Sequence, residues 1–329
     1  MRRTIRAAAS WMDGGWLAKR ILRAQSLDAV GAVRFHRLSS GRRVYLVQVD
    51  GHTYVLELDP RLDRLRTGVQ AAMTAAEHRL SAARLLGSDA SLMALCRYGA
   101  GYAIFEYVEG RHPSYDCPLE DITSIATTYA QVHSVTRSLP GIGAIKGWTL
   151  DEYIAAWNAI ASDIGSTSEW PQWLLRNRPF DVGTYQLVHG DANRGNVLLK
   201  TDGQSVLIDL GGMHFGFPPL ELVYLLLYYC GSDAARRMRF IDVYRERLGN
   251  LFETWERHAA FWLFGGLMER ARYRIASARN RRIAGEYSKA DKRVQDARAA
   301  VDHATRVAKL FQDGKGQLEE VLDECWEPY

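Results

Sequence analysis

The alternation of apolar and polar positions predicts that the first part of the chain is rich in β-strands. From Val33 onwards, short runs of β-branched and aromatic residues are separated by turn signals. Asp50-Gly51 is a strong hairpin signal, and a β-rich run from His52 to Leu58 follows it. Residues 91–96 and 102–108 are apolar again and suit two more strands. These segments together predict consecutive antiparallel strands of one small sheet.

Helices are predicted before, within and after this sheet. Apolar positions at helical spacing predict a helix within residues 1–30. A segment rich in Ala, Leu and Met predicts a helix over 68–87 that ends at Gly87. Beyond this the pattern is mostly helical, apart from a compact β segment from Tyr185 to Asp209. We therefore predict a first domain over residues 1–110 and a helical second domain over 111–329.

Composition and charge narrow the class of protein. Of the 329 residues, 47% are hydrophobic and 24% are charged, which is ordinary for a folded globular protein. A net charge of +4 is small for this length, so neither a nucleic acid nor a membrane is expected as a partner.

The run from Leu220 to Cys230 is too short to span a bilayer. The basic start lacks an uninterrupted apolar core, so no signal peptide is expected. The four cysteines are far apart, which argues against a zinc site or a disulfide framework and favours a reduced, cytoplasmic protein.

Polar groups at the margins of two apolar strands carry the candidate chemistry. Asp191 and, five residues later, Asn196 follow the run Leu187-Val188, and Asp209 follows a second apolar run. Phosphoryl transfer needs a carboxylate that orients the attacking hydroxyl and accepts its proton. It also needs hard oxygen ligands for Mg²⁺. An Asp, an Asn and a second Asp in this order supply that set.

The segment His189-Gly190-Asp191-x-x-x-x-Asn196, followed by Ile208-Asp209, resembles the motif of aminoglycoside phosphotransferases, choline kinases and related small-molecule kinases. The resemblance implies that Asp191 is the catalytic base, that Asn196 and Asp209 bind Mg²⁺, and that His189 braces the loop. It also implies a bilobal, protein-kinase-like α+β fold. Its small lobe would be a five-stranded antiparallel sheet with one helix, its large lobe would be mostly helical, and ATP would lie between them.

The resemblance extends to a predicted hinge at residues 105–110, Phe105-Glu106-Tyr107-Val108-Glu109-Gly110. By analogy, the carbonyl of Glu106 and the amide of Val108 would meet the adenine edge. Phe105 would occupy the gatekeeper position. Glu77 would be the helix glutamate that normally pairs with a strand-3 cation.

One residue departs from the family pattern. Relatives have a Lys or Arg in the strand that here contains Glu57, and a carboxylate at that position would repel both Glu77 and ATP. The strand alignment could be off by one residue, or the chain could have lost ordinary kinase activity. We favour a third explanation, that a basic residue from a neighbouring strand replaces the missing cation. The candidates are Arg42, Arg43, Arg34 and Arg37.

The resemblance predicts an ATP- and Mg²⁺-dependent phosphotransferase acting on a hydroxyl of a small molecule, such as an antibiotic, an amino alcohol, a sugar or a natural-product intermediate. Two alternatives stay open. The acceptor could be a peptide Ser or Thr, with a partner protein docking on the N-terminal helix or on the basic late helices. Alternatively, Glu57 could mark a nucleotide-binding pseudokinase, although the intact Asp191, Asn196 and Asp209 oppose that. His214 could either reach a substrate or face solvent.

Overall fold

The computed structural model describes residues 21, 30–37, 42–49, 51–89, 101–137, 147–164, 170–179 and 185–312. The chain forms two compact units. The first comprises the described residues up to Arg111 together with Asn196–Met213, and the second comprises the described residues of His112–Gly195 and from His214 onwards. The first unit's N-terminal part thus ends one residue after the boundary predicted at Gly110. The segment 196–213, expected in the helical domain, is grouped with the sheet.

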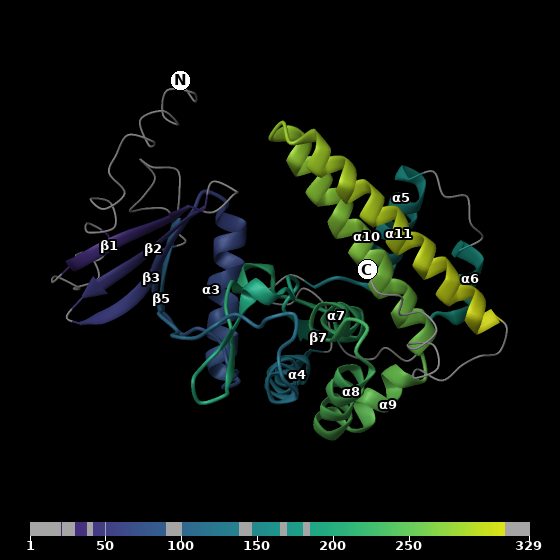
Figure 1. The fold of residues 1–329 in the computed structure, drawn as a ribbon, viewed down its shortest axis with the longest axis horizontal. Helices are drawn as coiled ribbons and strands as arrows, with labels where there is room; N and C mark the ends of the chain where they lie inside the picture. The colour runs from purple at the N-terminus through teal and green to yellow at the C-terminus, as the bar shows by residue number, and fades with distance from the viewer. Residues whose placement is uncertain are drawn as a thin grey trace. The chain divides into compact units, whose positions relative to one another are not determined.

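The first unit is built on a five-stranded antiparallel sheet in the order β1-β2-β3-β5-β4. Figure 1 labels β1, β2, β3 and β5 of this sheet. The β2–β3 pair is a hairpin in which Val49 faces His52, as the Asp50-Gly51 signal predicts. The predicted small antiparallel sheet is therefore confirmed. Its strands are β1 (Val30–Arg37), β2 (Arg43–Val49), β3 (His52–Asp59), β4 (Leu85–Asp89) and β5 (Gly101–Glu106).

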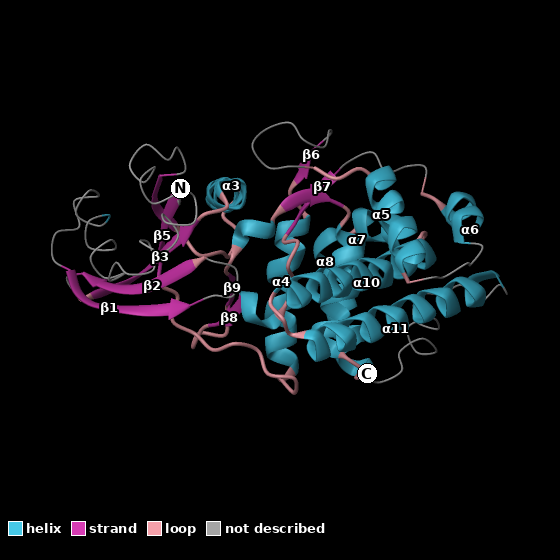
Figure 2. Ribbon diagram, turned by 90° about the horizontal axis from the view of Figure 1, so that it is seen from above, coloured by secondary structure: helices cyan, strands magenta, loops and turns pink. Residues whose placement is uncertain are grey.

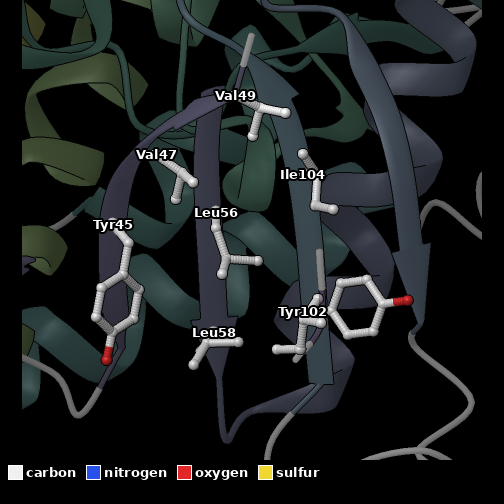
Figure 3. Packing of buried hydrophobic residues seen from close by; sticks show 8 residues of the cluster. Tyr45, Val47, Val49, Leu56, Leu58, Tyr102 and Ile104 are labelled. Atoms are coloured by element: carbon white, nitrogen blue, oxygen red, sulfur yellow. The ribbon is translucent and has the colours of Figure 1, made fainter. Parts of the chain in front are cut away.

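One face of this sheet carries the apolar core of the first unit. Alternate residues of a strand point to the same face, so a two-residue period places a row of side chains together. β2, β3 and β5 each contribute such a row to one buried cluster, and Ile21 packs into it. Most of the helix predicted over residues 1–30 lies outside the described residues. Figure 3 shows the strand residues of the cluster: Tyr45, Val47, Val49, Leu56, Leu58, Tyr102 and Ile104.

Among the residues that the structure describes, the helix after β3 begins and ends earlier than the sequence pattern predicts. Helix α3 spans Leu62–Glu77, whereas 68–87 was expected. Arg79 has a φ of 54°, a left-handed conformation that does not continue a helix. Gly87 accordingly lies inside strand β4 rather than at a helix end. The strand predicted over 91–96 lies outside the described residues.

A short hairpin completes the first unit. Strand β8 (Val197–Leu199) pairs with β9 (Ser205–Leu207), and one-turn 3-10 helices flank it, η1 (Arg194–Asn196) and η2 (Leu210–Gly212). The backbone of Leu207 accepts a hydrogen bond from Ala83 and donates one to Ser81. The hairpin is thereby tied to the segment that leads from α3 to β4.

The second unit is mostly helical and carries a small antiparallel sheet, β10-β7-β6. Its two long helices, α10 and α11, lie side by side (Figure 2). Within the described part of the chain, no helix has both the length and the apolar character needed to cross a membrane. The elements are α4 (Leu119–His133), β6 (Thr136–Arg137), α5 (Leu150–Asp163), α6 (Trp170–Asn177), β7 (Tyr185–Val188), β10 (His214–Gly216), α7 (Pro218–Leu225), the π-helical η3 (Leu226–Cys230), α8 (Ala234–Leu248), α9 (Asn250–Glu256), α10 (Ala259–Ile283) and α11 (Tyr287–Gln312).

Candidate active site

The predicted catalytic loop lies in the second unit and begins where β7 ends at Val188. His189 is fully buried, and Gly190 has a φ of 75°, a left-handed conformation that glycine adopts without a steric penalty. The chain turns sharply at this glycine. The next residue, Asp191, is exposed to solvent.

Glu221 holds this loop in place from the first turn of α7. Its two carboxylate oxygens accept hydrogen bonds from the backbone amides of His189, at 2.8 Å, and Gly190, at 2.7 Å. The same carboxylate lies 2.9 Å from Nε2 of His133, whose Nδ1 lies 3.0 Å from the Tyr244 hydroxyl. Burial works to raise the pKa of Glu221, but these hydrogen-bonding partners lower it below its ordinary value. The loop is therefore fixed by an ionised, buried carboxylate.

Two further contacts orient the Asp191 side chain and its neighbours. Nδ2 of Asn193 donates to Oδ1 of Asp191 at 2.9 Å, and Oδ1 of Asn193 accepts from the amide of Gly195 at 2.8 Å. The hydroxyl of Tyr273, on α10, donates to the backbone carbonyl of Gly190. The backbone directly before Asp191 is thus held by Glu221 of α7 and by Tyr273 of α10.

Asp191 lines a pocket in the second unit of about 580 Å³, a volume that includes its opening to solvent. Val188, Gly190 and Glu221 line the same pocket, so the braced loop forms part of its wall. His214 is also part of it, and its Nε2 lies 2.9 Å from the Tyr153 hydroxyl. Most of the remaining wall is aromatic: Tyr153, Phe217, Tyr224, Tyr228 and Tyr273.

The predicted metal ligands lie in the first unit, on either side of the β8–β9 hairpin. Asn196 is buried, and its carbonyl accepts a hydrogen bond from the amide of Ile208 at 3.0 Å. This bond ties the two strand ends together and places Asn196 beside the residue that precedes Asp209. Asp209 has φ 56° and ψ 58°, a left-handed conformation that Asp tolerates better than most residues and that is enriched at functional sites.

Two guanidinium groups contact the Asp209 carboxylate. Nη1 of Arg42 donates to Oδ2 of Asp209 at 2.7 Å, and Nη2 of Arg64 lies 3.1 Å from Oδ1. Burial works to raise the pKa of Asp209, but the positive charges of Arg42 and Arg64 outweigh it and lower that pKa below its ordinary range. Asp209 is therefore held in its ionised form, the form that can bind a metal ion.

Arg42 also neutralises the unexpected carboxylate of strand β3. Its Nη2 donates to Oε2 of Glu57 at 2.7 Å, and both side chains are buried. Burial raises the pKa of Glu57, and Arg42 offsets part of that effect. Burial also disfavours the charged form of Arg42, but Glu57 and Asp209 outweigh it and raise the pKa of Arg42. We call Arg42, Glu57, Arg64 and Asp209 the charge cluster; with all four ionised, its charges sum to zero.

The charge cluster supports the explanation that a neighbouring arginine supplies the missing cation, because Arg42 contacts both Glu57 and the predicted metal ligand Asp209. Arg43 is the first residue of β2 and lies opposite Leu58 of β3. The side chains of Arg34 and Arg37 lie outside the described residues. Glu77 is exposed as the last residue of α3, so the carboxylate that pairs with the cation is Glu57.

Sequence reasoning did not find Arg64, because the helix was expected to begin four residues after it. A glycine makes room for this side chain. A Cβ atom on Gly211 would lie 2.9 Å from Nε of Arg64, closer than such atoms approach. Gly211 and Gly212, shortly after Asp209, were the available signal for a closely packed neighbour, because the Arg64 side chain lies against the backbone of Gly211.

The predicted hinge begins within β5 of the first unit and continues beyond it. Phe105 and Glu106 are its last two residues, and Val108 is half-buried. The amide of Glu106 donates to the carbonyl of Arg84 at 2.9 Å, and its carboxylate pairs with the Arg84 side chain at 2.8 Å. The role of these residues in binding adenine stays a prediction.

Most cations of the late helices, noted above as a possible docking surface, are ion-paired within the second unit. Arg279 pairs with Asp163 at 2.7 Å and Arg281 with Glu286 at 2.5 Å, for example. Such pairs add little stability at a surface, but they cancel much of its positive charge. The others that pair are Arg272, Arg274, Arg282, Lys289 and Arg293.

Comparison with known proteins gives matches over most of the chain. Acyl-CoA dehydrogenase family member 11 of Gallus gallus is 26% identical over 228 residues, which are 60% of this chain and 28% of that protein. The chain thus spans less than a third of that curated relative. A candidate aminoglycoside phosphotransferase from Ralstonia eutropha JMP134 has a similar structure, with a TM-score of 0.67 and 17% identity over 90% of this chain and 98% of that one.

A variant of aminoglycoside phosphotransferase APH(4)-Ia, solved as a ternary complex with AMP-PNP and hygromycin B, has a TM-score of 0.57. It is 16% identical and covers 86% of this chain and 97% of that one. At these low identities, the two structures show the fold that the sequence motif implies. The model of the phosphotransferase enzyme family, APH, matches residues 33–261, which include the charge cluster and the catalytic loop. The chain therefore belongs to the APH phosphotransferase enzyme family.

Proposed function

We propose that the protein transfers the γ-phosphate of ATP, with Mg²⁺, to a hydroxyl group of a small molecule. The observation that carries this proposal is the position of Asp191, an exposed carboxylate on a loop that Glu221 fixes and that lines an aromatic pocket. Family membership supports phosphoryl transfer as the reaction class. The AMP-PNP and hygromycin B in one structural relative support a nucleotide donor and a small-molecule acceptor.

In the proposed reaction Asp191 orients the acceptor hydroxyl and removes its proton. The acceptor oxygen forms a bond to the γ-phosphorus, and the bond from that phosphorus to the β,γ-bridging oxygen breaks. The products are a phosphate monoester and ADP, and the proton resides on the Asp191 carboxyl until solvent takes it. Such a step depends mainly on position and charge, so the bracing of the loop is central to it.

Asn196 and Asp209 fit a Mg²⁺ ion by the chemistry of their donors. An amide oxygen and an ionised carboxylate are the hard ligands that Mg²⁺ prefers. Each Asp209 oxygen accepts from a guanidinium group, and a carboxylate oxygen has lone pairs beyond those that such a bond uses. Bound Mg²⁺ would neutralise charge on the phosphates during transfer.

Arg42 and Arg64 would provide the fixed positive charge for the phosphates. The guanidinium group is permanently charged and matches phosphate oxygens in geometry. In this proposal Arg42 takes the part that the family gives to a strand-3 cation, and Glu57 holds it there as Glu77 was expected to do. This weighs against the pseudokinase alternative, which depended on Glu57 being uncompensated.

The peptide-kinase alternative finds less support. It requires docking surfaces for a partner, and the proposed basic surface on the late helices is largely ion-paired within the second unit. The second proposed surface, the N-terminal helix, lies mostly outside the described residues. A small-molecule acceptor needs neither surface, and Asp191 lines a pocket whose wall is largely aromatic, as ligand sites commonly are.

Calorimetric titration of ATP, with and without Mg²⁺, tests the first part of the proposal. Binding that depends on Mg²⁺ is expected, and its abolition by Asp209→Asn but not by the exposed control Glu253→Gln would assign the metal to this carboxylate. Transfer of labelled γ-phosphate to a panel of alcohols tests the second part. Mg²⁺-dependent ATP binding without transfer to any alcohol would reject the acceptor assignment, and absence of ATP binding would reject the proposal as a whole.

A further inference from the structure

We propose that the pocket around Asp191 accepts an uncharged alcohol that carries a flat aromatic or apolar group, rather than a cationic amino alcohol or an aminoglycoside. The inference deepens the proposed function and rests on it for the role of Asp191 as the base. It follows from the charged groups and the aromatic residues that line the pocket in the second unit.

The carboxylates of the pocket are already engaged with protein groups. Of the three that the described residues contribute, only Asp191 is exposed, whereas Glu221 and Glu269 are buried. Glu221 is held by two backbone amides and by His133. Glu221 and Glu269 are both buried and paired with protein groups, so this wall offers a cationic ligand little beyond Asp191 itself.

Glu269 is neutralised by an arginine of its own helix. Nε of Arg272 lies 3.0 Å from both Glu269 oxygens, and Nη2 lies 2.7 Å from Oε2. The indole Nε1 of Trp157 donates to Oε1 at 2.8 Å. The Glu269 charge is therefore fully compensated inside the protein, and a ligand ammonium group would compete with a preorganised guanidinium for it.

Arg272 also occupies aromatic surface that an ammonium group could otherwise use. Its guanidinium carbon lies 4.9 Å from the ring centre of Tyr273 and 5.4 Å from that of Trp148. Aromatic faces attract cations, and a ring that already holds one offers less to a second.

The remaining wall is largely aromatic. Tyr224 and Tyr228 are stacked with ring centres 5.5 Å apart, and Tyr273 meets Tyr224 edge-on at 5.6 Å. The hydroxyls of Tyr153 and Tyr273 are engaged with His214 and the Gly190 carbonyl. A flat, apolar ligand would bury its surface on these rings, and its hydroxyl would face the one exposed carboxylate.

Two probes that differ in charge but share a ring and a hydroxyl test this inference. They are phenylalaninol, which carries an ammonium group at neutral pH, and N-acetylphenylalaninol, which is uncharged. N-acetylethanolamine, uncharged and without a ring, and choline, cationic and without a ring, complete the set. The binding of each to the full chain would be measured by calorimetry with Mg²⁺ and AMP-PNP present, and phosphate transfer would be measured with Mg²⁺ and ATP.

We expect N-acetylphenylalaninol to bind at least about tenfold more tightly than either phenylalaninol or N-acetylethanolamine, because it alone combines ring burial with the absence of charge. Tyr224→Leu and Tyr228→Leu should each remove most of the preference for a ring. The matched control, Tyr287→Leu, changes an exposed tyrosine at the start of α11 and should leave the preference unchanged. Circular dichroism would confirm that each variant is folded.

The outcomes separate the inference from the function on which it rests. Tighter binding of phenylalaninol or choline, no binding of N-acetylphenylalaninol, or a ring preference that survives in both folded pocket variants would overturn the inference. The expected binding order without phosphate transfer to any probe would keep the pocket assignment and count against the proposed catalysis. Phosphate transfer that favours the cationic probes would support the proposed catalysis and overturn the pocket assignment.

Discussion

Arg42 lies 2.7 Å from the carboxylate of Asp209, and so brings a positive charge from the residue before β2 to the predicted metal ligand. The other side of the same guanidinium group holds Glu57. The chain thus keeps a cation at this point although its third strand carries an acid. This arrangement leads to a prediction that separates stability from nucleotide binding.

Replacing Arg42 with methionine should destabilise the first unit, because it leaves the Glu57 carboxylate buried without a partner. Breaking a buried pair from one side typically costs about 3–5 kcal/mol of unfolding free energy. The double variant Arg42→Met/Glu57→Met should recover most of that loss, since an apolar pair of similar volume is often as stable. Denaturant unfolding would measure both changes.

Nucleotide affinity should respond differently to the same two variants. Both lack the guanidinium group, so both should bind Mg²⁺-ATP more weakly than the unmodified protein. If the double variant recovered nucleotide affinity together with stability, Arg42 would have only a structural role.

Gly211→Ala should displace Arg64 without unfolding the protein. The added methyl group would lie 2.9 Å from Nε of Arg64, and this flexible side chain can move aside at little cost. We expect Gly211→Ala and Arg64→Met to weaken Mg²⁺-ATP binding to a similar extent. Their combination should weaken it no further, because residues that act through one contact are not additive. Calorimetry on the four proteins of the cycle checks this, and additive effects would show that the glycine acts elsewhere.

Glu221→Gln should loosen the catalytic loop. A glutamine offers one oxygen and one amide nitrogen to the two backbone amides of His189 and Gly190, so one buried donor loses its acceptor at a cost of about 1–3 kcal/mol. We expect a lower kcat with a nearly unchanged KM for ATP. Glu253→Gln on the exposed face of α9 is the matched control. A change confined to KM would contradict the bracing role.

The Glu221 contribution should also depend on pH in a defined direction. The folded protein lowers the pKa of this carboxyl below its ordinary value of 4.5. A lowered pKa stabilises the fold above the unfolded-state pKa, and that stability is lost as the pH falls through the folded value. The difference in unfolding free energy between the unmodified protein and Glu221→Gln should therefore be constant near neutral pH and shrink below 4.5. Urea unfolding at several pH values measures this.

Asp191→Asn and Asp209→Asn should fail in different ways. Loss of a general base commonly reduces kcat by about 10²- to 10⁴-fold, so Asp191→Asn should lose turnover and keep Mg²⁺-ATP affinity. Asp209→Asn should instead lose the Mg²⁺ dependence of ATP binding. Parallel calorimetry and transfer assays distinguish the two, and a shared loss of nucleotide affinity would contradict the separate roles.

The sequence predicted strands β2, β3 and β5 and the catalytic motif, because these depend on local signals, but it assigned most of β4 (Leu85–Asp89) to a helix. Strand period and the Asp50-Gly51 turn located β2 and β3, and the His189-to-Asn196 spacing located the loop. The helix was misplaced because the Ala-rich segment favours helix up to Gly87. The left-handed residue that ends the helix, Arg79, carries no glycine or proline signal.

The supporting residues of the site could not be predicted in the same way. Arg64, Glu221 and Tyr273 act on residues that are 145, 31 and 83 positions away, so only the folded chain brings them together. The sequence could propose several arginines as the missing cation, because nothing local distinguishes Arg42 from Arg43. In the folded chain, it is Arg42 whose guanidinium group contacts both Glu57 and Asp209.

The pairing of Arg42 with Glu57 also bears on how such a site can change over generations. The two charges are buried against each other. A single substitution that restores a basic residue at position 57 would therefore place two cations together, and a substitution that removes Arg42 would leave the Glu57 carboxylate buried without a partner. A change between a carboxylate and a cation at position 57 would therefore pass through an unstable single variant, or it would need a second substitution at position 42 at the same time. Arg42 and Glu57 would then be inherited together, as one coupled pair.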